Sequence, residues 1–158
     1  MGRDLLIYGA GGAGRELAFS LSLNRDSETS WNVRGFIDDT EYLKGKIIND
    51  IKVLGGCEYL QLYRGSVAVC IVSNPKVKER LVKKIENNFV VHFPVITSSH
   101  SFVSPHAQLG EGCIISLPHN IISPNVTLGR HVFINAGTRI GHDSSVGDFT
   151  TIYSGVDI

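Results

Sequence analysis

The sequence of 158 residues predicts an α/β unit followed by a parallel β-helix. Up to residue 94, short apolar runs alternate with turns and helix-compatible segments, which is typical of α/β folds. From residue 95 onward, aliphatic residues recur at every sixth position, which is typical of a solenoid. The 17 glycines fall in different arrangements in these two parts. We therefore expect two domains, residues 1–94 and 95–158.

Charge and composition exclude several classes of function. With 15 basic and 15 acidic side chains, the chain has no net charge and lacks the basic footprint that a nucleic-acid partner requires. Its apolar runs are far shorter than the roughly 20 residues that span a bilayer, and the N-terminus lacks the apolar core of a signal peptide. We therefore expect a cytoplasmic protein without membrane insertion. The three cysteines form no C-x-x-C pair, so we expect them to be buried and unbonded.

The α/β unit should begin with a strand, a glycine turn and a helix. Apolar runs indicate the strands, and charged or amphipathic spacing indicates the helices. We expect strands over Asp4–Tyr8, Trp31–Ile37 and Val67–Val72, and helices over Arg15–Leu21 and Lys76–Asn87. This alternation favours a parallel sheet with helices on its faces.

The turn after the first strand carries the glycine motif of nucleotide-binding folds. It satisfies G-x-G-x-x-G, and the strand before it and the helix after it are the context that the motif requires. Glycine lets the backbone approach a pyrophosphate, while free N–H groups at the helix N-terminus face the anion. We therefore expect a nucleotide to be held at Gly9, Gly11, Gly12 and Gly14. The alternative is a purely structural turn.

Polar residues follow the second and third strands, at the edge where open α/β sheets collect ligands. Asp38 stands about 24 residues beyond Gly14, where a carboxylate can accept a hydrogen bond from a ribose hydroxyl. Asp39, Ser73 and Asn74 are further candidates for substrate binding. Ordinary solvated turns are the alternative interpretation of these residues.

The first unit is short for a complete dinucleotide fold, because no second half follows it. Its length argues against an NAD-dependent oxidoreductase. A mononucleotide or one nucleotide diphosphate fits a single half.

The second part repeats with a period of six residues, with one extra residue that we place after Ile121. Small or β-branched residues stand two positions before each inward residue, and His119 is the misfit where we expect a small bulge. Three hexads would form a triangular coil of about 18 residues, and successive coils would stack as parallel ladders. The expected inward positions are Thr97, Val103, Leu109, Ile115, Ile121, Leu128, Ile134, Ile140, Val146, Ile152 and Ile158.

Together these segments resemble the hexapeptide-repeat sugar acetyltransferases. The resemblance is carried by residues 6–18, by Gly35–Asp39 and by the hexads over Ile134–Phe149, in which His142-Asp143 follows an Ile-Asn-x-Gly hexad. This group N-acetylates nucleotide-linked amino sugars, and sialic acid O-acetyltransferases are close relatives. The resemblance implies a left-handed β-helix, a homotrimer, acetyl-CoA as co-substrate and a nucleotide-linked amino sugar as acceptor.

Acetyl transfer supplies its own reason for a histidine. The attacking amine or hydroxyl must lose a proton as it bonds to the thioester carbon, and an imidazole is an effective acceptor near neutral pH. His142 matches the family's general base and is followed by Asp143, which could orient it. The position that matches Asn135 lies near the reacting acetyl group in the family, and the backbone amide of Gly141 is a candidate contact to acetyl-CoA. A solvated corner histidine and a conformational asparagine are the alternatives.

The other histidines offer no comparable arrangement. His100, His106 and His131 fall at corner positions that we expect to be solvated. The intervals of 12 residues from His119 to His131 and 11 from His131 to His142 put these three at different phases of the repeat. We therefore expect no metal site.

Two departures from the family pattern matter. Ala13 stands in the glycine loop where relatives often carry a larger or polar residue, and the later coils that bind the pantetheine arm of CoA are not among these 158 residues. We therefore expect an incomplete β-helix. The leading hypothesis is an acetyl-CoA-dependent N-acetyltransferase. Sugar O-acetylation and a non-catalytic, trimeric module that binds nucleotide sugars are the alternatives.

Overall fold

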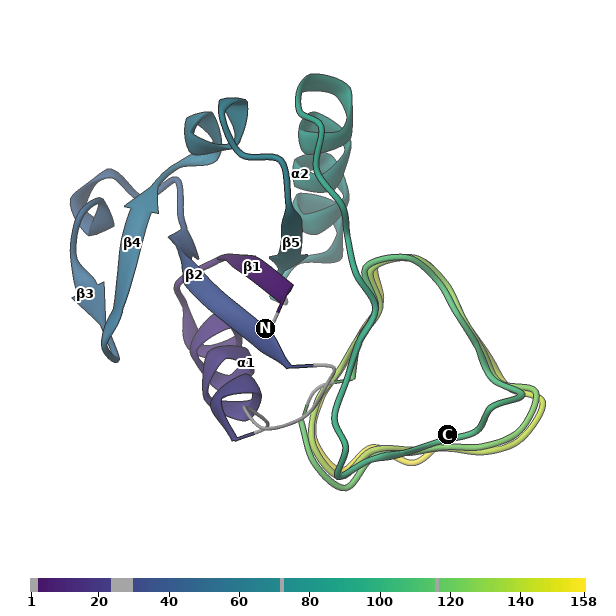
Figure 1. The fold of residues 1–158 in the computed structure, drawn as a ribbon. Helices are drawn as coiled ribbons and strands as arrows, with labels where there is room; N and C mark the ends of the chain where they lie inside the picture. Colours follow the sequence, from purple (N-terminus) through teal and green to yellow (C-terminus); the bar gives the residue numbers. More distant parts are fainter. Residues whose placement is uncertain (1–2, 24–29, 72, 116) are drawn as a thin grey trace. The chain divides into compact units, whose positions relative to one another are not determined.

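The computed structural model describes residues 3–23, 30–71, 73–115 and 117–158. The chain divides after Phe93 into two compact units, an α/β unit and a coil of triangular turns (Figure 1). In the described ranges, no helix is long and apolar enough to cross a membrane. Cys57, Cys70 and Cys113 are buried, which confirms the predicted burial of these side chains.

The α/β unit is built on a five-stranded sheet in the order β3-β4-β2-β1-β5. Neighbouring strands pair in parallel, except that β3 is antiparallel to β4. Residues 5–7 of the interior strand β1 are almost completely buried, because an interior parallel strand is covered on both faces. The strands are β1 (Arg3–Tyr8), β2 (Trp31–Ile37), β3 (Ile47–Ile48), β4 (Ile51–Gly55) and β5 (Ser66–Val69).

The order of the strands reverses beside β1. The chain runs from β1 to β2 and β4 on one side, and β5 then pairs with the other side of β1. Gly9 follows β1 directly, and Ile71 stands just beyond β5. Open α/β sheets bind ligands at the carboxyl ends of their strands at such a reversal. The topology therefore places the glycine turn at the edge where a ligand is expected.

The strand predictions were largely correct, and one hairpin was missed. β2 has the predicted bounds and β1 begins one residue earlier. β5 ends at Val69, whereas the predicted strand ran to Val72, which lies outside the described residues. The β3–β4 hairpin turns on Asn49 and Asp50, whose φ angles are 46° and 64°. Two-residue hairpin loops require such left-handed angles, and an Asn-Asp pair between isoleucines is a signal that could have identified this hairpin.

The two helices begin differently, because only α2 has a side-chain cap. α1 (Gly12–Ser22) starts earlier than predicted, with Gly11 as its N-cap, and α2 (Pro75–Asn88) starts at a proline in its first turn. The side chain of Asn74 caps α2, accepting hydrogen bonds from the backbone N–H groups of Lys76 and Val77. Asn followed by Pro is a strong helix-start signal, because both residues suit the unpaired first turn. Two short 3-10 helices, η1 (Glu41–Leu43) and η2 (Cys57–Gln61), complete the unit.

The second unit is a parallel β-helix of two-residue strands. Within the described ranges the strands form three parallel sheets, one on each side of the triangle (Figure 1). The inward residues of these strands form the core with the small residues two positions before them. The first sheet contains β7 (Phe102–Val103), β10 (Ile121–Ile122) and β13 (Arg139–Ile140), the second β8 (Gln108–Leu109), β11 (Thr127–Leu128) and β14 (Ser145–Val146), and the third β6 (Ile96–Thr97), β9 (Ile114–Ile115), β12 (Phe133–Ile134) and β15 (Thr151–Ile152).

The predicted phase of the repeat was wrong around the extra residue. Ile122, which is 1% exposed, is the inward residue, whereas Ile121 is 42% exposed. The extra residue therefore lies between Ile115 and Ile122, before the position that we had expected. This shift moves His119 from the predicted inward position to an exposed corner, and Asn120 takes its place in the core.

His131 also departs from its prediction. We expected a solvated corner histidine, but its side chain is 2% exposed and stacks on Phe149 with the ring centroids 5.5 Å apart. Phe149 stands at the equivalent corner of the next coil, and Gly112 stands at that corner of the preceding one. A Cβ on Gly112 would collide with the imidazole, and Gly112 has a φ of +71°. The imidazole thus fills a space that a neighbouring glycine leaves open.

Asn120 is fully buried and holds the irregular turn together. Its side-chain N–H donates to the carbonyl of Leu117 at 2.9 Å, and its side-chain oxygen accepts from the backbone N–H of Thr138 at 2.9 Å. A buried amide whose donor and acceptor are both hydrogen-bonded stabilises the fold. Removing it is destabilising, because a buried backbone group that is left without a partner carries the full desolvation penalty.

We expect Asn120→Ala to lower the free energy of unfolding by about 2 kcal/mol, because the buried N–H of Thr138 loses its acceptor and the Leu117 carbonyl keeps only the Ser101 hydroxyl as a side-chain donor. Thr127→Ala is the matched control, since Thr127 is exposed on β11. Urea unfolding of both variants checks this expectation. Equal stability of the two variants would show that the Asn120 network contributes nothing.

Candidate functional site

The four candidate glycines of the turn after β1 differ in what the fold requires of them. Gly9 has a φ of +107° and donates its N–H to the carbonyl of Ile37 at 2.7 Å. A Cβ on Gly14 would overlap the carbonyl oxygen of Gly9. In contrast, a Cβ on Gly11 or Gly12 would meet nothing within 4 Å. Packing therefore explains Gly9 and Gly14, and only Gly11 and Gly12 leave open backbone beside α1 for a ligand.

Asp38 ties the glycine turn to the segment after β2. Its two side-chain oxygens accept hydrogen bonds from the backbone N–H groups of Ala10 and Thr40, both at 2.9 Å. Partial burial raises the pKa of Asp38, but the hydrogen bonds from Ala10 and Thr40 outweigh it and hold the pKa below its usual value. Asp38 is therefore an ionised structural tie, and a ribose contact would have to use its remaining lone pairs.

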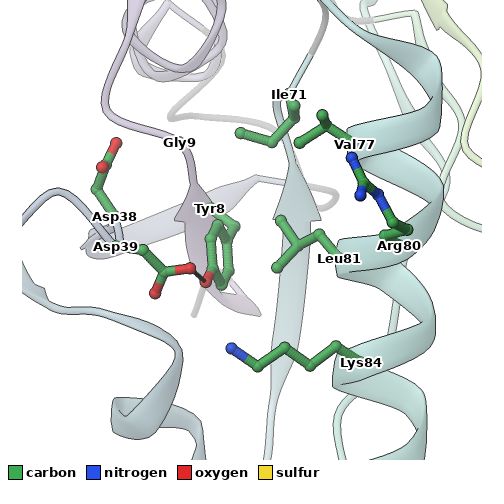
Figure 2. Close-up of a pocket in the computed structure, with 9 residues that line it drawn as sticks. All are labelled: Tyr8, Gly9, Asp38, Asp39, Ile71, Val77, Arg80, Leu81 and Lys84. Carbon is green, nitrogen blue, oxygen red and sulfur yellow. Dashed lines mark hydrogen bonds between the residues drawn. The ribbon is translucent and has the colours of Figure 1, made fainter.

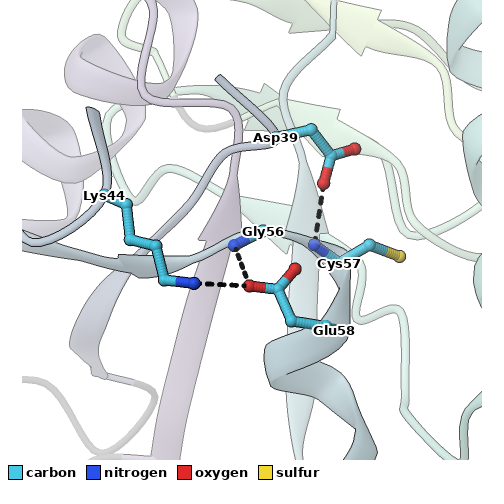
Figure 3. A network of polar contacts seen from close by, with 5 residues as sticks. All are labelled: Asp39, Lys44, Gly56, Cys57 and Glu58. Atoms are coloured by element: carbon cyan, nitrogen blue, oxygen red, sulfur yellow. Dashed lines mark hydrogen bonds and ion pairs between the residues drawn. The ribbon is translucent and has the colours of Figure 1, made fainter. Parts of the chain in front are cut away.

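Asp39 has a similar structural role. One oxygen accepts a hydrogen bond from the hydroxyl group of Tyr8 at 2.7 Å (Figure 2). The other accepts a hydrogen bond from the backbone N–H of Cys57 at 2.7 Å (Figure 3). Burial and the hydrogen bond to Asp39 raise the pKa of Tyr8. In Figure 3, Glu58 also accepts hydrogen bonds from the ammonium group of Lys44 and from the backbone N–H of Gly56. These contacts join the ends of β1, β2 and β4, so Asp39 shapes one wall of the adjoining cavity.

A cavity of about 410 Å³ lies between this wall and α2 (Figure 2). Its lining is mostly apolar, with Arg80 and Lys84 as the cations. Neither cation is paired with a carboxylate in the described part of the chain, whereas Lys83 on the same helix contacts Glu79 at 2.6 Å. The carboxylates of Asp38 and Asp39 also line the cavity, but their oxygens accept hydrogen bonds from protein donors. Apolar walls beside two cations without a carboxylate partner suit a ligand with a flat apolar body and negative charge. The lining residues are Tyr8, Gly9, Asp38, Asp39, Ile71, Val77, Arg80, Leu81 and Lys84.

The structure includes some of the predicted binding residues in this cavity and leaves others out. Gly9, Asp38 and Asp39 line it, but Ser73 and Asn74 do not, and the Asn74 side chain is engaged in capping α2. The sequence analysis missed Arg80 and Lys84. They share one helix face with Val77 and Leu81, because residues three and four apart are neighbours on a helix. A search for cations at this spacing beyond the third strand could have found them.

His142 and Asp143 meet at a corner of the β-helix. The Nδ1 atom of His142 lies 2.7 Å from an oxygen of Asp143, and both side chains are exposed. On an ideal strand adjacent side chains point apart, but Asp143 has a φ of +62°, which turns its side chain toward its neighbour. The hydrogen bonds from His142 and then Asn125 lower the pKa of Asp143. The carboxylate is therefore ionised near neutral pH and can only accept hydrogen bonds.

Gly141 departs from its prediction, and Asn135 is engaged locally. The Gly141 N–H donates to the carbonyl of Ile158 at 2.7 Å, so it belongs to the ladder between coils and is not the accessible amide that we expected. The side-chain oxygen of Asn135 accepts the backbone N–H of Ala136 at 2.7 Å. Asn135 and His142 stand at the two corners on either side of β13. Over the described residues, no group of three His, Cys, Asp or Glu side chains could hold a metal ion.

Known proteins match both units. The family model of the PglD N-terminal domain matches residues 4–85. GDP-perosamine N-acetyltransferase of Escherichia coli O157:H7 is 31% identical over 151 residues, which are 94% of this chain, and the chain spans 66% of that protein.

Solved structures share the fold at low identity. WeeI of Acinetobacter baumannii AYE has a TM-score of 0.76 and 23% identity, covering 96% of this chain and 69% of that one. A variant of GDP-perosamine N-acetyltransferase of Caulobacter crescentus, in complex with CoA and GDP-perosamine, has a TM-score of 0.67 and 15% identity, covering 98% and 88%. The predicted fold class, an α/β unit followed by a left-handed parallel β-helix, is confirmed.

Gly14 and Gly11 allow a test of which glycines of the turn are required for packing. We expect Gly14→Ala to destabilise the protein by about 2 kcal/mol, because the added methyl group overlaps the Gly9 carbonyl. Gly11→Ala should stay within about 0.5 kcal/mol of the unchanged protein, because its methyl group enters open space. Thermal or urea unfolding gives both values. A Gly14→Ala protein as stable as Gly11→Ala would contradict this assignment.

Proposed function

The chain belongs to the PglD N-terminal domain family, and from this premise we propose that it transfers an acetyl group from acetyl-CoA to an amino group of a nucleotide-linked sugar. The observation that carries the proposal is the His142–Asp143 pair at an exposed corner of the β-helix. The similarity to a GDP-perosamine N-acetyltransferase supports it. The proposal extends to acetyl-CoA as acyl donor and to an amino sugar as acceptor.

His142 has the geometry of a general base. In the neutral imidazole, the ionised Asp143 favours the proton on Nδ1, and this tautomer leaves the lone pair of Nε2 for the substrate. As the substrate amine attacks the thioester, an N–C bond forms, the C–S bond breaks, and CoA leaves as a thiolate. The proton released from the amine passes to Nε2. Asp143 stabilises the positive charge that His142 then carries.

The α/β unit is proposed to hold the nucleotide. The open backbone at Gly11 and Gly12 suits the diphosphate, because helix N-termini attract anions. The cavity beside it offers apolar walls from Ile71 and Leu81 for a flat base. Arg80 and Lys84 add positive charge beside those walls. Asp38, with both oxygens already engaged, is proposed to act mainly by holding this site in shape.

A homotrimer is part of the proposal, with Asn135 near the reacting acetyl group. The His142 side chain is 80% exposed, and a base so open to water needs a second surface to enclose the substrate. A neighbouring copy of the β-helix would supply that surface. The Gly141 amide is not proposed as a contact to acetyl-CoA, because its N–H already donates to the carbonyl of Ile158.

Two other functions give different results in the same assays. Transfer to a hydroxyl group, as in sialic acid O-acetylation, would use the same base. Thiol release with a sugar that has a hydroxyl group but no amino group would reveal this reaction. A non-catalytic module would bind a nucleotide sugar but not acetyl-CoA. The occupied amide of Gly141 is the observation that favours this second function.

We expect His142→Ala to lower the rate of CoA thiol release roughly 10²–10⁴-fold, because the amine loses its proton acceptor. His106→Ala is the matched control, since His106 is an exposed histidine at the equivalent corner of an earlier coil. A thiol reagent with a panel of nucleotide-linked amino sugars measures the rates. Full activity of His142→Ala would show that His142 is not the general base.

We also expect Arg80→Met and Lys84→Met each to weaken binding of GDP or UDP about tenfold, because a hydrogen bond to a charged group contributes roughly 1.5–3 kcal/mol. Lys83→Met removes a cation from the same helix outside the cavity and should leave the affinity unchanged. Titration calorimetry measures the affinities. Equal affinities for all three variants would show that the cations of the cavity do not bind the nucleotide.

A further inference from the structure

Asn125 stands one coil before the His142–Asp143 pair, at the same corner. The pairing of Thr127 with Ser145 fixes this register, so Asn125 lies beneath Asp143. The backbone N–H of Asp143 donates to the carbonyl of Pro124 at 3.2 Å, which ties the two corners together. Asn125 and Asp143 have φ angles of 61° and 62°. Similar φ angles at the same corner of adjacent coils place the two side chains side by side.

The Asn125 side chain is hydrogen-bonded to the candidate catalytic pair. Its Nδ2 donates to Oδ1 of Asp143 at 3.0 Å, while Oδ2 of Asp143 faces Nδ1 of His142 at 2.7 Å. One carboxylate therefore has a partner on each oxygen. Because Asn125 donates to Oδ1, rotation of the carboxylate away from the imidazole would break the hydrogen bond to Asn125 as well as the one to His142.

We propose that Asn125 is a positioning residue, which holds the Asp143 carboxylate against Nδ1 of His142 and thereby fixes the imidazole tautomer that leaves Nε2 free. The proposal deepens the proposed function and rests on it only for the effect on catalysis. In a histidine, the group bonded to one ring nitrogen sets which nitrogen carries the proton. A carboxylate that is free to rotate would leave that choice to solvent.

The backbone alone does not account for this arrangement. A left-handed φ favours Asn or Gly at position 125, but it does not determine where the amide points. His119 has a φ of 65° in the same coil and stands one corner away. A change of His119 to glycine therefore alters a left-handed corner of the same coil without touching the Asn125–Asp143 hydrogen bond.

The imidazole tautomer of His142 is the readout, and it requires no substrate. In ¹⁵N-labelled protein, the chemical shifts of the two ring nitrogens report which one carries the proton while the imidazole is neutral. We expect the unchanged protein to hold His142 mainly as the Nδ1–H form. Asn125→Gly keeps the backbone conformation accessible and removes the donor, so it should shift His142 toward the Nε2–H form.

Asn125→Asp provides a second route to the same result. The variant is nearly isosteric, but its carboxylate repels Asp143 rather than donating to it, so the same shift toward Nε2–H is expected. His119→Gly is the matched control and should leave the tautomer of His142 unchanged. Unchanged tautomer populations in both Asn125 variants would overturn the proposal.

Kinetics then test the catalytic consequence separately. In thiol-release assays, Asn125→Gly should lower kcat about tenfold with KM unchanged, because a misplaced catalytic group slows the chemical step. If the unchanged protein releases no thiol with any sugar nucleotide, the proposed function fails while the tautomer result still decides the role of Asn125. An unaltered kcat in Asn125→Gly, in a protein that is active, would remove the role in catalysis.

Discussion

The parallel pairing of each two-residue strand with the strand one coil later is the constraint on which the second unit depends. After the extra residue, pairs such as Ile122 with Ile140 keep an interval of 18 residues. This interval aligns the corners as well as the strands, so side chains at one corner form a column. The stack of His131 on Phe149 and the contact of Asn125 with Asp143 are two consequences of the same register. The candidate catalytic pair therefore owes its geometry to coil stacking.

The first unit depends on a different device, in which carboxylates tie loops together at the ligand-binding edge. Asp38 bonds the glycine turn, and Asp39 bonds both β1 and the start of η2. Charged acceptors of backbone N–H groups make stronger hydrogen bonds than neutral ones. The acidic pair thus stabilises the shape of the cavity, and the cations of α2 are left to face a ligand.

The sequence was sufficient for what is periodic or local. Hexad spacing predicted the β-helix, the apolar runs predicted β1 and β2, and the adjacency of His142 and Asp143 located their corner. The phase at Ile121–Ile122 could not be predicted, because two adjacent isoleucines satisfy the pattern equally well. The burial of His131 depends on Gly112 and Phe149 in neighbouring coils, and the hydrogen bond of Gly141 on Ile158. These contacts link residues about 18 apart, where a local pattern carries no signal.

The exposed corners of a β-helix can carry functional side chains with little loss of stability. Strand residues are constrained, since one side chain of each strand must fill the core. Exposed corner residues such as Asn125 and Asp143 supply no side chain to the core and need only tolerate the turn, which Asn, Asp and Gly do most easily. Asn125 and Asp143 meet that conformational requirement with side chains that can also donate or accept hydrogen bonds. Asn and Asp therefore meet two requirements at this corner. They tolerate the left-handed turn, and their side chains can orient a histidine.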